Sequence, residues 1–546
     1  MVTGEQLSME FRHLGGGTIG GLLHSRASVV AEKPFLLTRD RSLSYGEFDA
    51  LVDDTARAFR ALGCAKGDHV CLMIANRVEF LAAWFGLARS GLVQVPINTA
   101  YKGEFLSYVI EHSQAQVLVV DRAFQVQLET VRPALQHLKH IIFVQDQSFG
   151  AAPDLGSPEI HTWNDFLANA AAEMSEHPAV APSDLATIMY TSGTTGRSKG
   201  VLVPHAHSVT MGAEATHAFR ITSQDVLYTC MPLFHGNAQW ATVLNALSAG
   251  ATVALGERFS ASRFWDEVRA FGATEFNAIG SMLYMLQAQP ASDRDRDHSV
   301  RAVFAAPAPV EIFYRFEHRF GVRLIEGYGL TETKNVAYNP YDARRPGSFG
   351  KPTETTILSI LGLDGTELGP GETGEIAYRP TKPNILCYGY FRNPEATLEA
   401  TRGLWWHTGD LGFRDVDGYF YFVDRAKDAV RRRGENISSF EIERVLLMHP
   451  KILDAAAIAA RSDVIEDELM VVCVRKPGED LSFEELFRYC DLRMPSFMVP
   501  RYYRFVVDLP RTPNNKIRKV ELRNEGMTPD VWDALSAGFK PTRLER

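Results

Sequence analysis

A repeated alternation of short apolar runs and amphipathic segments constrains the fold most. Ser44 and Glu47 form an S-x-x-E capping box ahead of an amphipathic segment that Gly63 ends, which predicts a helix. The segments that follow predict, in order, a strand, a helix and a strand: His69–Ile74, Val78–Arg89 and Leu92–Ile97. Strands that alternate with helices in this way predict a parallel sheet.

The same pattern recurs further along the chain. Short runs typical of buried strands are Leu185–Tyr190, Val253–Leu255, Glu275–Ile279 and Ala302–Ala305. The first of these runs leads directly into a loop rich in glycine and hydroxyl side chains. Ligands of α/β proteins usually bind at strand ends, so we expect this loop to carry a binding site.

The length of 546 residues is too great for one ordinary core, so we expect at least two domains. From Gly362 to Arg379 the sequence becomes rich in glycine and proline and is typical of short strands. A charged junction follows at Asp424–Asp428. We place the boundary at this junction. The predicted domains are residues 1–426 and 427–546, in an α/β protein.

Composition argues against several classes of function. The formal charge is −9 and the longest basic run is Arg431–Arg433, which argues against nucleic acid as a partner. No apolar stretch reaches the roughly 18 residues of a membrane span. Six cysteines without C-x-x-C pairs argue against a zinc site built on them and against a disulfide framework, and they favour a reducing cytoplasm.

The loop from Tyr190 to Gly200 combines glycines, hydroxyls, Arg197 and Lys199, which is typical of a phosphate-binding loop. Lys199 is followed by Gly200, whereas a P-loop has serine or threonine there. The loop is therefore a different kind of phosphate loop. On composition alone, a flexible surface connection is an equal alternative.

Further motifs are separated from this loop by long stretches of chain. They are Glu326–Glu332, with a tyrosine, a threonine and a final carboxylate; Trp405–Asp410; and Leu509–Lys519, with several cations. Each alone is commonly an ordinary turn or a solvated surface segment. Their order and spacing resemble the adenylate-forming superfamily of acyl-CoA synthetases, adenylation domains of nonribosomal peptide synthetases and beetle luciferases.

The resemblance runs from about residue 35 to about residue 520. It implies a large N-terminal domain of α/β sheets with a small β-rich subdomain, and a smaller, mobile α+β C-terminal domain that rotates about Lys427. Within the superfamily, the motif surroundings resemble the crotonobetaine/carnitine-CoA ligase group most.

The resemblance also implies roles for individual residues. Lys516, Glu332, Thr191 and His235 are the expected catalytic residues, and Glu332 the expected Mg²⁺ ligand. Tyr328 would offer a flat face to a purine, Asp410 would accept from the ribose hydroxyls, and Arg425 would approach the ribose. The full set of expected cofactor-binding residues is Thr191, Ser192, Gly193, Thr194, Thr195, Gly196, Lys199, Tyr328, Gly329, Thr331, Asp410, Arg425 and Gly434.

Gly434 would let the backbone approach the pantetheine arm of CoA closely. The residues expected to line the acyl pocket are His235, Asn237, Gly280, Ser281 and Ala305. Three positions depart from the family pattern: Ser198 replaces a common proline, Asn514–Asn515 precede the lysine, and Ala305–Ala306–Pro307 replace Gly-Gly-Ala. The two extra methyl groups would narrow the acid pocket.

The function predicted from the sequence is ATP-dependent acid:CoA ligation, with ATP, Mg²⁺ and CoA as cofactors and a small carboxylic acid as substrate. The acid would become an acyl-adenylate and then a CoA thioester. Two alternatives remain open: an adenylating enzyme that passes the acyl group to a carrier protein or partner enzyme, and a nucleotide sensor without turnover. We expect a cytoplasmic protein without a membrane span, and a homodimer as the assembly.

Overall fold

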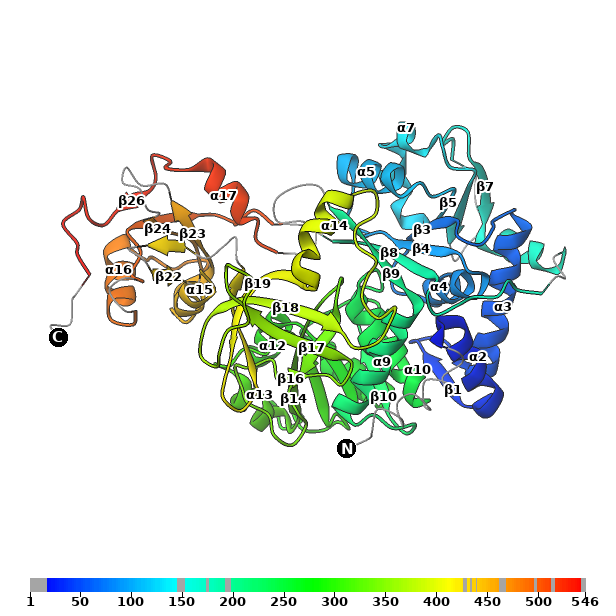
Figure 1. The fold of residues 1–546 in the computed structure, drawn as a ribbon, viewed down its shortest axis with the longest axis horizontal. Helices are drawn as coiled ribbons and strands as arrows, with labels where there is room; N and C mark the ends of the chain where they lie inside the picture. The colour runs from blue at the N-terminus through cyan, green and yellow to red at the C-terminus, as the bar shows by residue number, and fades with distance from the viewer. Residues whose placement is uncertain are drawn as a thin grey trace. The chain divides into compact units, whose positions relative to one another are not determined.

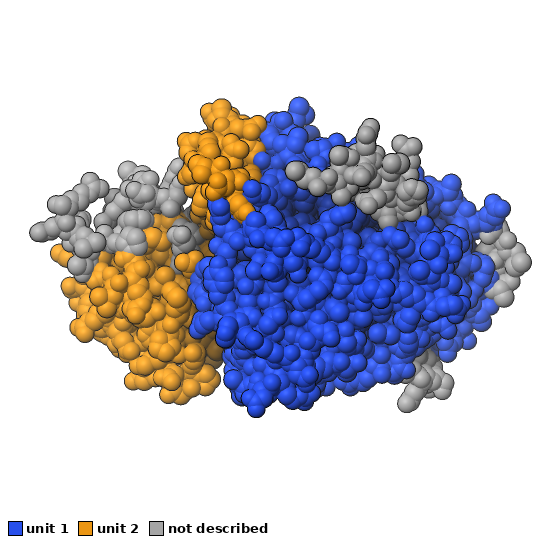
Figure 2. Space-filling model, turned by 90° about the horizontal axis from the view of Figure 1, so that it is seen from below, with its two compact units in different colours: residues 1–191, 199–358, 378–406 blue, residues 192–198, 359–377, 407–546 orange. Residues whose placement is uncertain are grey.

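The computed structural model describes residues 17–144, 153–172, 176–191, 198–425, 430–432, 435–437, 439–460, 468–494, 498–511 and 516–541. The chain divides into two compact units, coloured blue and orange in Figure 2. The first comprises residues 1–191, 199–358 and 378–406, and the second comprises 192–198, 359–377 and 407–546. The predicted boundary between residues 426 and 427 falls outside the described residues and stays a prediction.

The first sheet of unit 1 has seven strands in the order β7-β6-β5-β3-β4-β8-β9. All neighbours pair in parallel except β8 and β9. The strands are β3 His69–Met73, β4 Val93–Pro96, β5 Val117–Asp121, β6 His140–Val144, β7 Glu159–Thr162, β8 Leu185–Thr191 and β9 Lys199–Pro204.

Helices cover both faces of this sheet (Figure 1). Residues of α5 (Gly103–Ser113), α6 (Gln125–Glu129) and α7 (Arg132–Leu135) share one buried core with the side chains of one face. On the other side, α4 (Val78–Ser90) contacts β3 and β4, and α8 (Trp163–Ala168) contacts β6 and β7. The predicted alternation of helices and parallel strands is therefore confirmed.

The second sheet of unit 1 has nine strands in the order β16-β15-β14-β13-β12-β10-β11-β1-β2. The strands are β1 Pro34–Leu37, β2 Ser42–Ser44, β10 Val226–Thr229, β11 Thr252–Leu255, β12 Glu275–Ala278, β13 Ala302–Ala305, β14 Arg323–Leu330, β15 Lys334–Tyr338 and β16 Lys351–Pro352. The helical segments between them are α9 His205–Phe219, η4 Asn237–Leu244, α10 Asn245–Ala249, α11 Phe264–Phe271, α12 Gly280–Gln287 and α13 Phe313–Phe320.

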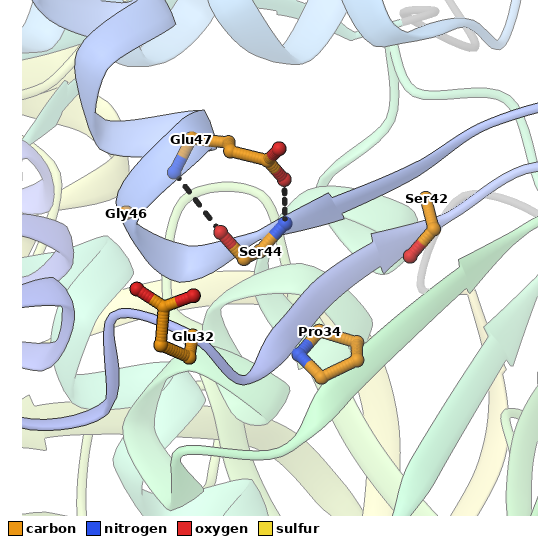
Figure 3. Close-up of a pocket in the computed structure, with 6 residues that line it drawn as sticks. All are labelled: Glu32, Pro34, Ser42, Ser44, Gly46 and Glu47. Carbon is orange, nitrogen blue, oxygen red and sulfur yellow. Dashed lines mark hydrogen bonds between the residues drawn. The ribbon is translucent and has the colours of Figure 1, made fainter.

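The predicted capping box stands at the start of α3 (Tyr45–Ala61). The Ser44 amide donates to Glu47 Oε2 over 2.8 Å, and the Glu47 amide donates to Ser44 Oγ over 3.2 Å, as Figure 3 shows. Helix α4 ends at Gly91, whose φ of 69° is the left-handed conformation common after a helix. Helix α2 (Ile19–Val30) packs on both α3 and α4.

A four-stranded sheet of order β17-β18-β19-β20 continues into unit 2. Its strands are β17 Thr356–Leu361, β18 Gly374–Pro380, β19 Trp406–Arg414 and β20 Phe420–Arg425, with α14 (Pro394–Ala400) before β19. The C-terminal part adds a hairpin, β21 (Val430–Arg432) with β22 (Glu435–Ile437), and a last four-stranded sheet. That sheet contains β23 Ile452–Ala460, β24 Glu468–Arg475, β25 Tyr502–Val506 and β26 Trp532–Asp533.

Helices α15 (Ser439–Leu447) and α16 (Phe483–Asp491) share a buried core with the last sheet, and α17 (Lys519–Glu525) adds Leu522 to a second core on it. The predicted fold class, a large α/β domain with a β-rich subdomain and a smaller α+β domain, is confirmed. Within the described ranges, no helix is both long and apolar enough to cross a membrane. All six cysteines are free thiols.

Candidate functional site

The predicted phosphate loop connects β8 to β9 at an edge of the seven-stranded sheet. Thr191, the last residue of β8, pairs with Lys199, the first residue of β9, and Thr191 Oγ1 donates to the Lys199 carbonyl over 3.5 Å. Ser192, Gly193, Thr194, Thr195 and Gly196 lie outside the described residues. The antiparallel pairing of β8 and β9 brings the two ends of the loop together.

A second segment runs beside β9. The amides of Tyr388 and Phe391 donate to the carbonyls of Leu202 and Gly200, and the Leu202 amide donates to the Gly389 carbonyl. These backbone bonds, 2.7 to 2.9 Å long, fix the segment against the strand that leaves the loop. They determine where the side chain of Tyr390 lies.

Tyr390 connects two of the predicted motifs. Lys199 Nζ lies 4.6 Å above the centre of the Tyr390 ring, and the Tyr390 hydroxyl donates to Glu332 Oε1 over 2.9 Å. Burial raises the pKa of the Tyr390 hydroxyl, and Glu332 raises it further, so the hydroxyl stays a proton donor at neutral pH. The loop lysine and the predicted metal ligand are thus held around one aromatic ring.

Glu332 lies in a three-residue turn between β14 and β15. Leu330 pairs with Lys334, which leaves Thr331, Glu332 and Thr333 in the turn. The Thr333 side chain closes the turn, since Thr333 Oγ1 accepts from the Leu330 amide and donates to the Lys334 carbonyl. Lys334 has a φ of 60°, the left-handed conformation that follows the turn in hairpins of this length.

A buried ion pair lies directly after this turn. Lys334 Nζ is 2.6 Å from Glu214 Oε2 of α9, and the Lys334 side chain is 0% exposed. Thr355 Oγ1 donates to the other Glu214 oxygen, and Lys334 also donates to the Asn335 carbonyl and to Thr353. Burial lowers the pKa of Lys334, and Glu214 opposes that shift. The pair joins α9, β15 and the segment before β17.

Tyr328, the expected purine platform, stacks on Phe349 with ring centres 4.5 Å apart. Gly329 is required for steric reasons, because a Cβ there would lie 2.1 Å from the Lys334 carbonyl oxygen. The hairpin therefore brings Tyr328, Gly329, Thr331 and Glu332 together at one end of β14.

Four of the five expected acyl-pocket residues lie at, directly after or in contact with the carboxyl-terminal parts of the parallel strands β12 and β13. Ala305 ends β13 and pairs with Ala278 on one side and Glu326 on the other. Gly280 and Ser281 begin α12, directly after β12. Asn237 begins the π-helical segment η4, and its Oδ1 accepts from Asn277 Nδ2 of β12 over 3.1 Å. His235 lies one residue before the N-cap of η4, with its ring 4.6 Å from that of Phe234.

In unit 2, the predicted ribose residues Asp410 and Arg425 pair across β19 and β20, with Arg425 Nε 2.7 Å from Asp410 Oδ1. The Asp410 side chain is 1% exposed and that of Arg425 is 41% exposed. Sequence reasoning missed Glu375, which accepts from the Gly409 amide and contacts His407 at 2.8 Å. Gly409 has a φ of 72°, so the turn before Asp410 favours glycine.

Lys516 is exposed and follows residues 512–515, which are outside the described ranges. Arg511 and Ile517 form an antiparallel bridge around it. Nearby, Arg511 pairs with Asp454, and Lys519 lies 2.7 Å from Glu443 Oε1. The exposed position suits a lysine that acts on a bound molecule. Lys427 and Gly434 lie outside the described residues.

The pocket drawn in Figure 3 is elsewhere in unit 1. It has a volume of about 360 Å³ and is lined by Glu32, Pro34, Ser42, Ser44, Gly46 and Glu47. Ser44 and Glu47 already use their hydrogen-bonding groups in the helix cap. The pocket contains none of the motif residues, so it is not the candidate site.

Comparisons with known proteins identify the family of this chain. A family model described as AMP-binding enzyme matches residues 23–390, and a model described as AMP-binding enzyme C-terminal domain matches residues 441–516. The crotonobetaine/carnitine–CoA ligase of Salmonella paratyphi A is 34% identical over 520 residues, which cover 93% of this chain and 99% of that protein.

Two solved structures extend the comparison. The anthranilate CoA ligase AuaEII in complex with anthranoyl-AMP has a TM-score of 0.83 and 25% identity, covering 96% of this chain and 98% of that one. The O-succinylbenzoate CoA synthetase of Bacillus subtilis in complex with ATP and a magnesium ion has a TM-score of 0.78 and 25% identity, covering 92% and 98%.

The Tyr390–Glu332 hydrogen bond predicts a specific effect of Tyr390→Phe. The variant keeps the ring beneath Lys199 and loses one hydrogen bond to a carboxylate, which contributes about 1.5 kcal/mol, or roughly tenfold in kcat/KM. We expect a higher Mg²⁺ concentration for half-maximal pyrophosphate release. The matched control is Tyr388→Phe, whose hydroxyl donates to the Ser183 carbonyl instead. Equal Mg²⁺ dependence of the two variants would contradict the assignment.

The Lys334–Glu214 pair predicts a large loss of stability in Lys334→Met. Removal of one partner leaves a buried, unpaired charge, so we expect the free energy of unfolding to fall by about 3 to 5 kcal/mol in urea denaturation. Lys351→Met, at an exposed lysine of β16, is the control. The double variant Lys334→Met/Glu214→Gln should recover part of the loss, and a single variant as stable as the control would refute the role of the pair.

Proposed function

Because the chain belongs to the family of AMP-binding enzymes, we propose that it is an acid–thiol ligase that activates a carboxylic acid with ATP and transfers it to CoA. In the first step, the carboxylate oxygen attacks the α-phosphorus of ATP, and pyrophosphate leaves. In the second step, the thiol of CoA attacks the carbonyl carbon of the acyl-adenylate, and AMP leaves.

The contact that best supports the first step is the one that Tyr390 makes with both Lys199 and Glu332. A phosphoryl centre is activated by alignment and by neutralisation of charge, and it requires no protein nucleophile. Lys199 supplies a cation at the phosphate loop. The Glu332 carboxylate and the neighbouring Thr331 hydroxyl are oxygen donors of the kind that Mg²⁺ prefers, so this turn fits the metal. Mg²⁺ would neutralise phosphate charge there.

The remaining residues orient the nucleotide. We propose that the Tyr328 ring faces the adenine and that Asp410 accepts from the ribose hydroxyls, with Arg425 holding Asp410 in place. Glu375 fixes the Gly409 amide and so orients the turn that carries Asp410. Thr191 and residues 192–196 would surround the phosphates.

Lys516 is proposed to bridge the carboxylate and the α-phosphate during the first step. The second step would use a rotation about Lys427 that withdraws Lys516 and brings Gly434 to the pantetheine arm. This proposal explains how a single enzyme can run two half-reactions with different requirements.

We propose a hydrophobic or aromatic acid as substrate. The expected pocket residues are His235, Asn237, Gly280, Ser281 and Ala305, and this set contains no carboxylate that could pair with a quaternary ammonium group. The relatives named above differ in their acids, since one is a crotonobetaine/carnitine–CoA ligase and another is an anthranilate CoA ligase.

The six free thiols support a cytoplasmic location, and a homodimer is the assembly that we expect, to be tested by sedimentation. A carrier-protein thiol is the alternative acceptor to CoA.

The two half-reactions should respond to different substitutions. We expect Lys516→Ala to lose most acyl-adenylate formation, by at least a hundredfold, and to retain transfer from supplied acyl-adenylate to CoA. Lys427→Pro should do the reverse, because proline fixes the backbone torsion of the proposed hinge. The control is Lys540→Ala, at another exposed lysine. Equal loss of both half-reactions in Lys516→Ala would refute its assigned role.

The overall function is tested by incubation with ATP, Mg²⁺, CoA and a pooled set of carboxylic acids, followed by mass spectrometry. We expect acyl-CoA thioesters. Acyl-adenylates alone would favour a carrier protein or a partner enzyme as the acceptor. ATP binding with no product from any acid class would favour a nucleotide sensor.

A further inference from the structure

Three side chains of the types that can bind a metal ion meet on β6 and β7, at the edge of the seven-stranded sheet opposite the predicted phosphate loop. They are His140, Glu159 and His161, and their ligand atoms all lie within 4.8 Å of one another. Neither the sequence motifs nor the proposed reaction uses them.

The register of the strands explains the cluster. Strands β6 and β7 are parallel, His140 pairs with Glu159, and Ile142 pairs with His161. Alternate residues of a strand share a face, so all three side chains lie on the same side of the sheet. This is the face contacted by α8, since Ile141 and Phe143 belong to the core on the opposite face.

The distances suit coordination by nitrogen and oxygen. His140 Nδ1 is 3.1 Å from His161 Nε2 and 3.6 Å from Glu159 Oε2. Two ligand atoms that each lie about 2.0–2.1 Å from a tetrahedral Zn²⁺ are separated by roughly 3.3 Å, which is close to both values. The imidazoles are 15% and 12% exposed and the carboxylate is 68% exposed, so an ion could enter from the solvent side.

The backbone around His140 supplies a second, independent indication. The backbone of Leu62, at the end of α3, forms a hydrogen bond with the His140 ring. Metal-binding histidines commonly donate their other ring N–H to a carbonyl, which fixes the tautomer and directs the remaining nitrogen to the metal. His140 Nδ1 faces His161 and Glu159, and the backbone of Leu62 is a further hydrogen-bonding partner of the same ring.

We propose that His140, His161 and Glu159 bind a divalent transition-metal ion, with Zn²⁺ as the preferred ion, and that the ion clamps edge strand β7 onto β6. Imidazole and carboxylate donors suit this class of ion, and water would complete the coordination. The scattered cysteines argue only against a cysteine-ligated site. Strand β7 is five strand spacings from β8, roughly 24 Å, so the metal acts on the fold and takes no part in acid activation.

The test uses the untagged full-length chain, stripped with EDTA, and titrates it with Zn²⁺ in excess Mg²⁺, which keeps Glu332 occupied by magnesium. We expect one Zn²⁺ per chain in the wild type and a rise in Tm on binding. Affinity should fall at least tenfold in His140→Gln and in His161→Gln. The control His137→Gln, at an exposed histidine just before β6, should bind like the wild type.

Glu159→Gln separates a loss of metal binding from a loss of folding. Because the Glu159 side chain is largely exposed, the Tm of the zinc-free variant should equal that of the zinc-free wild type. Its affinity for Zn²⁺ should fall as well. Co²⁺ should give the visible absorption of a tetrahedral site in the wild type and not in the histidine variants. If the wild type and His161→Gln bind Zn²⁺ alike, or if the wild type binds none at micromolar concentration, the two histidines are a hydrogen-bonded pair and the proposal is wrong.

Discussion

The candidate site depends on the burial of a charge. Lys334 must follow a three-residue turn in the left-handed conformation, and its side chain ends in the interior, 0% exposed. A buried ammonium costs several kcal/mol unless it is paired and hydrogen bonded. Glu214, Thr353 and the Asn335 carbonyl are the partners of the buried Lys334 ammonium. Glu214 and Thr353 come from other parts of unit 1, and Asn335 belongs to β15 itself. The position of Glu332, two residues earlier, therefore depends on a contact with α9, the helix that follows the phosphate-loop strand. Stability and the geometry of the site share one network.

Tyr390 also contacts Glu332. Backbone bonds to β9 set its place, its ring lies under Lys199, and its hydroxyl reaches Glu332. A flexible carboxylate at the tip of a turn would lose side-chain entropy each time it ordered around a metal. One hydrogen bond from a hydroxyl that burial keeps protonated reduces that loss. A tyrosine suits this position because it offers a ring to a cation and a proton to a carboxylate at once.

Local sequence patterns were sufficient to predict much of the fold. The capping box at Ser44, the helix predicted at Val78–Arg89 and the short apolar runs at β3, β4, β8 and β13 are each determined by neighbours within a few residues, and the structure has them where the sequence predicts. The contacts that organise the site are different in kind. Glu332 and Tyr390 are 58 residues apart, and Lys334 and Glu214 are 120 apart. Such pairs leave no periodicity in the sequence, because the two partners come from distant parts of the chain. The motif Glu326–Glu332 identified the turn, yet nothing local marked Lys334, Tyr390 or Glu375 as its supports.

The proposed acyl pocket depends on one local feature of the sequence and on one contact between distant residues. Ala305 lies at the carboxyl end of β13 between Ala278 and Glu326, fully buried, so its methyl group occupies space that a glycine would leave open. Opposite the end of β12, the chain enters a π-helical segment at Asn237, and a π-helix places an additional residue in each turn. That wider turn lets Asn237 reach Asn277 while Gln239 donates to the Leu233 carbonyl. In the proposed acyl pocket, the methyl group at Ala305 would narrow the space at the sheet, and the π-helical turn would set the position of the wall that carries Asn237. Substrate shape should therefore be controlled by these two elements jointly, and a glycine at Ala305 should admit bulkier acids only while the Asn237–Asn277 contact holds the wall in place.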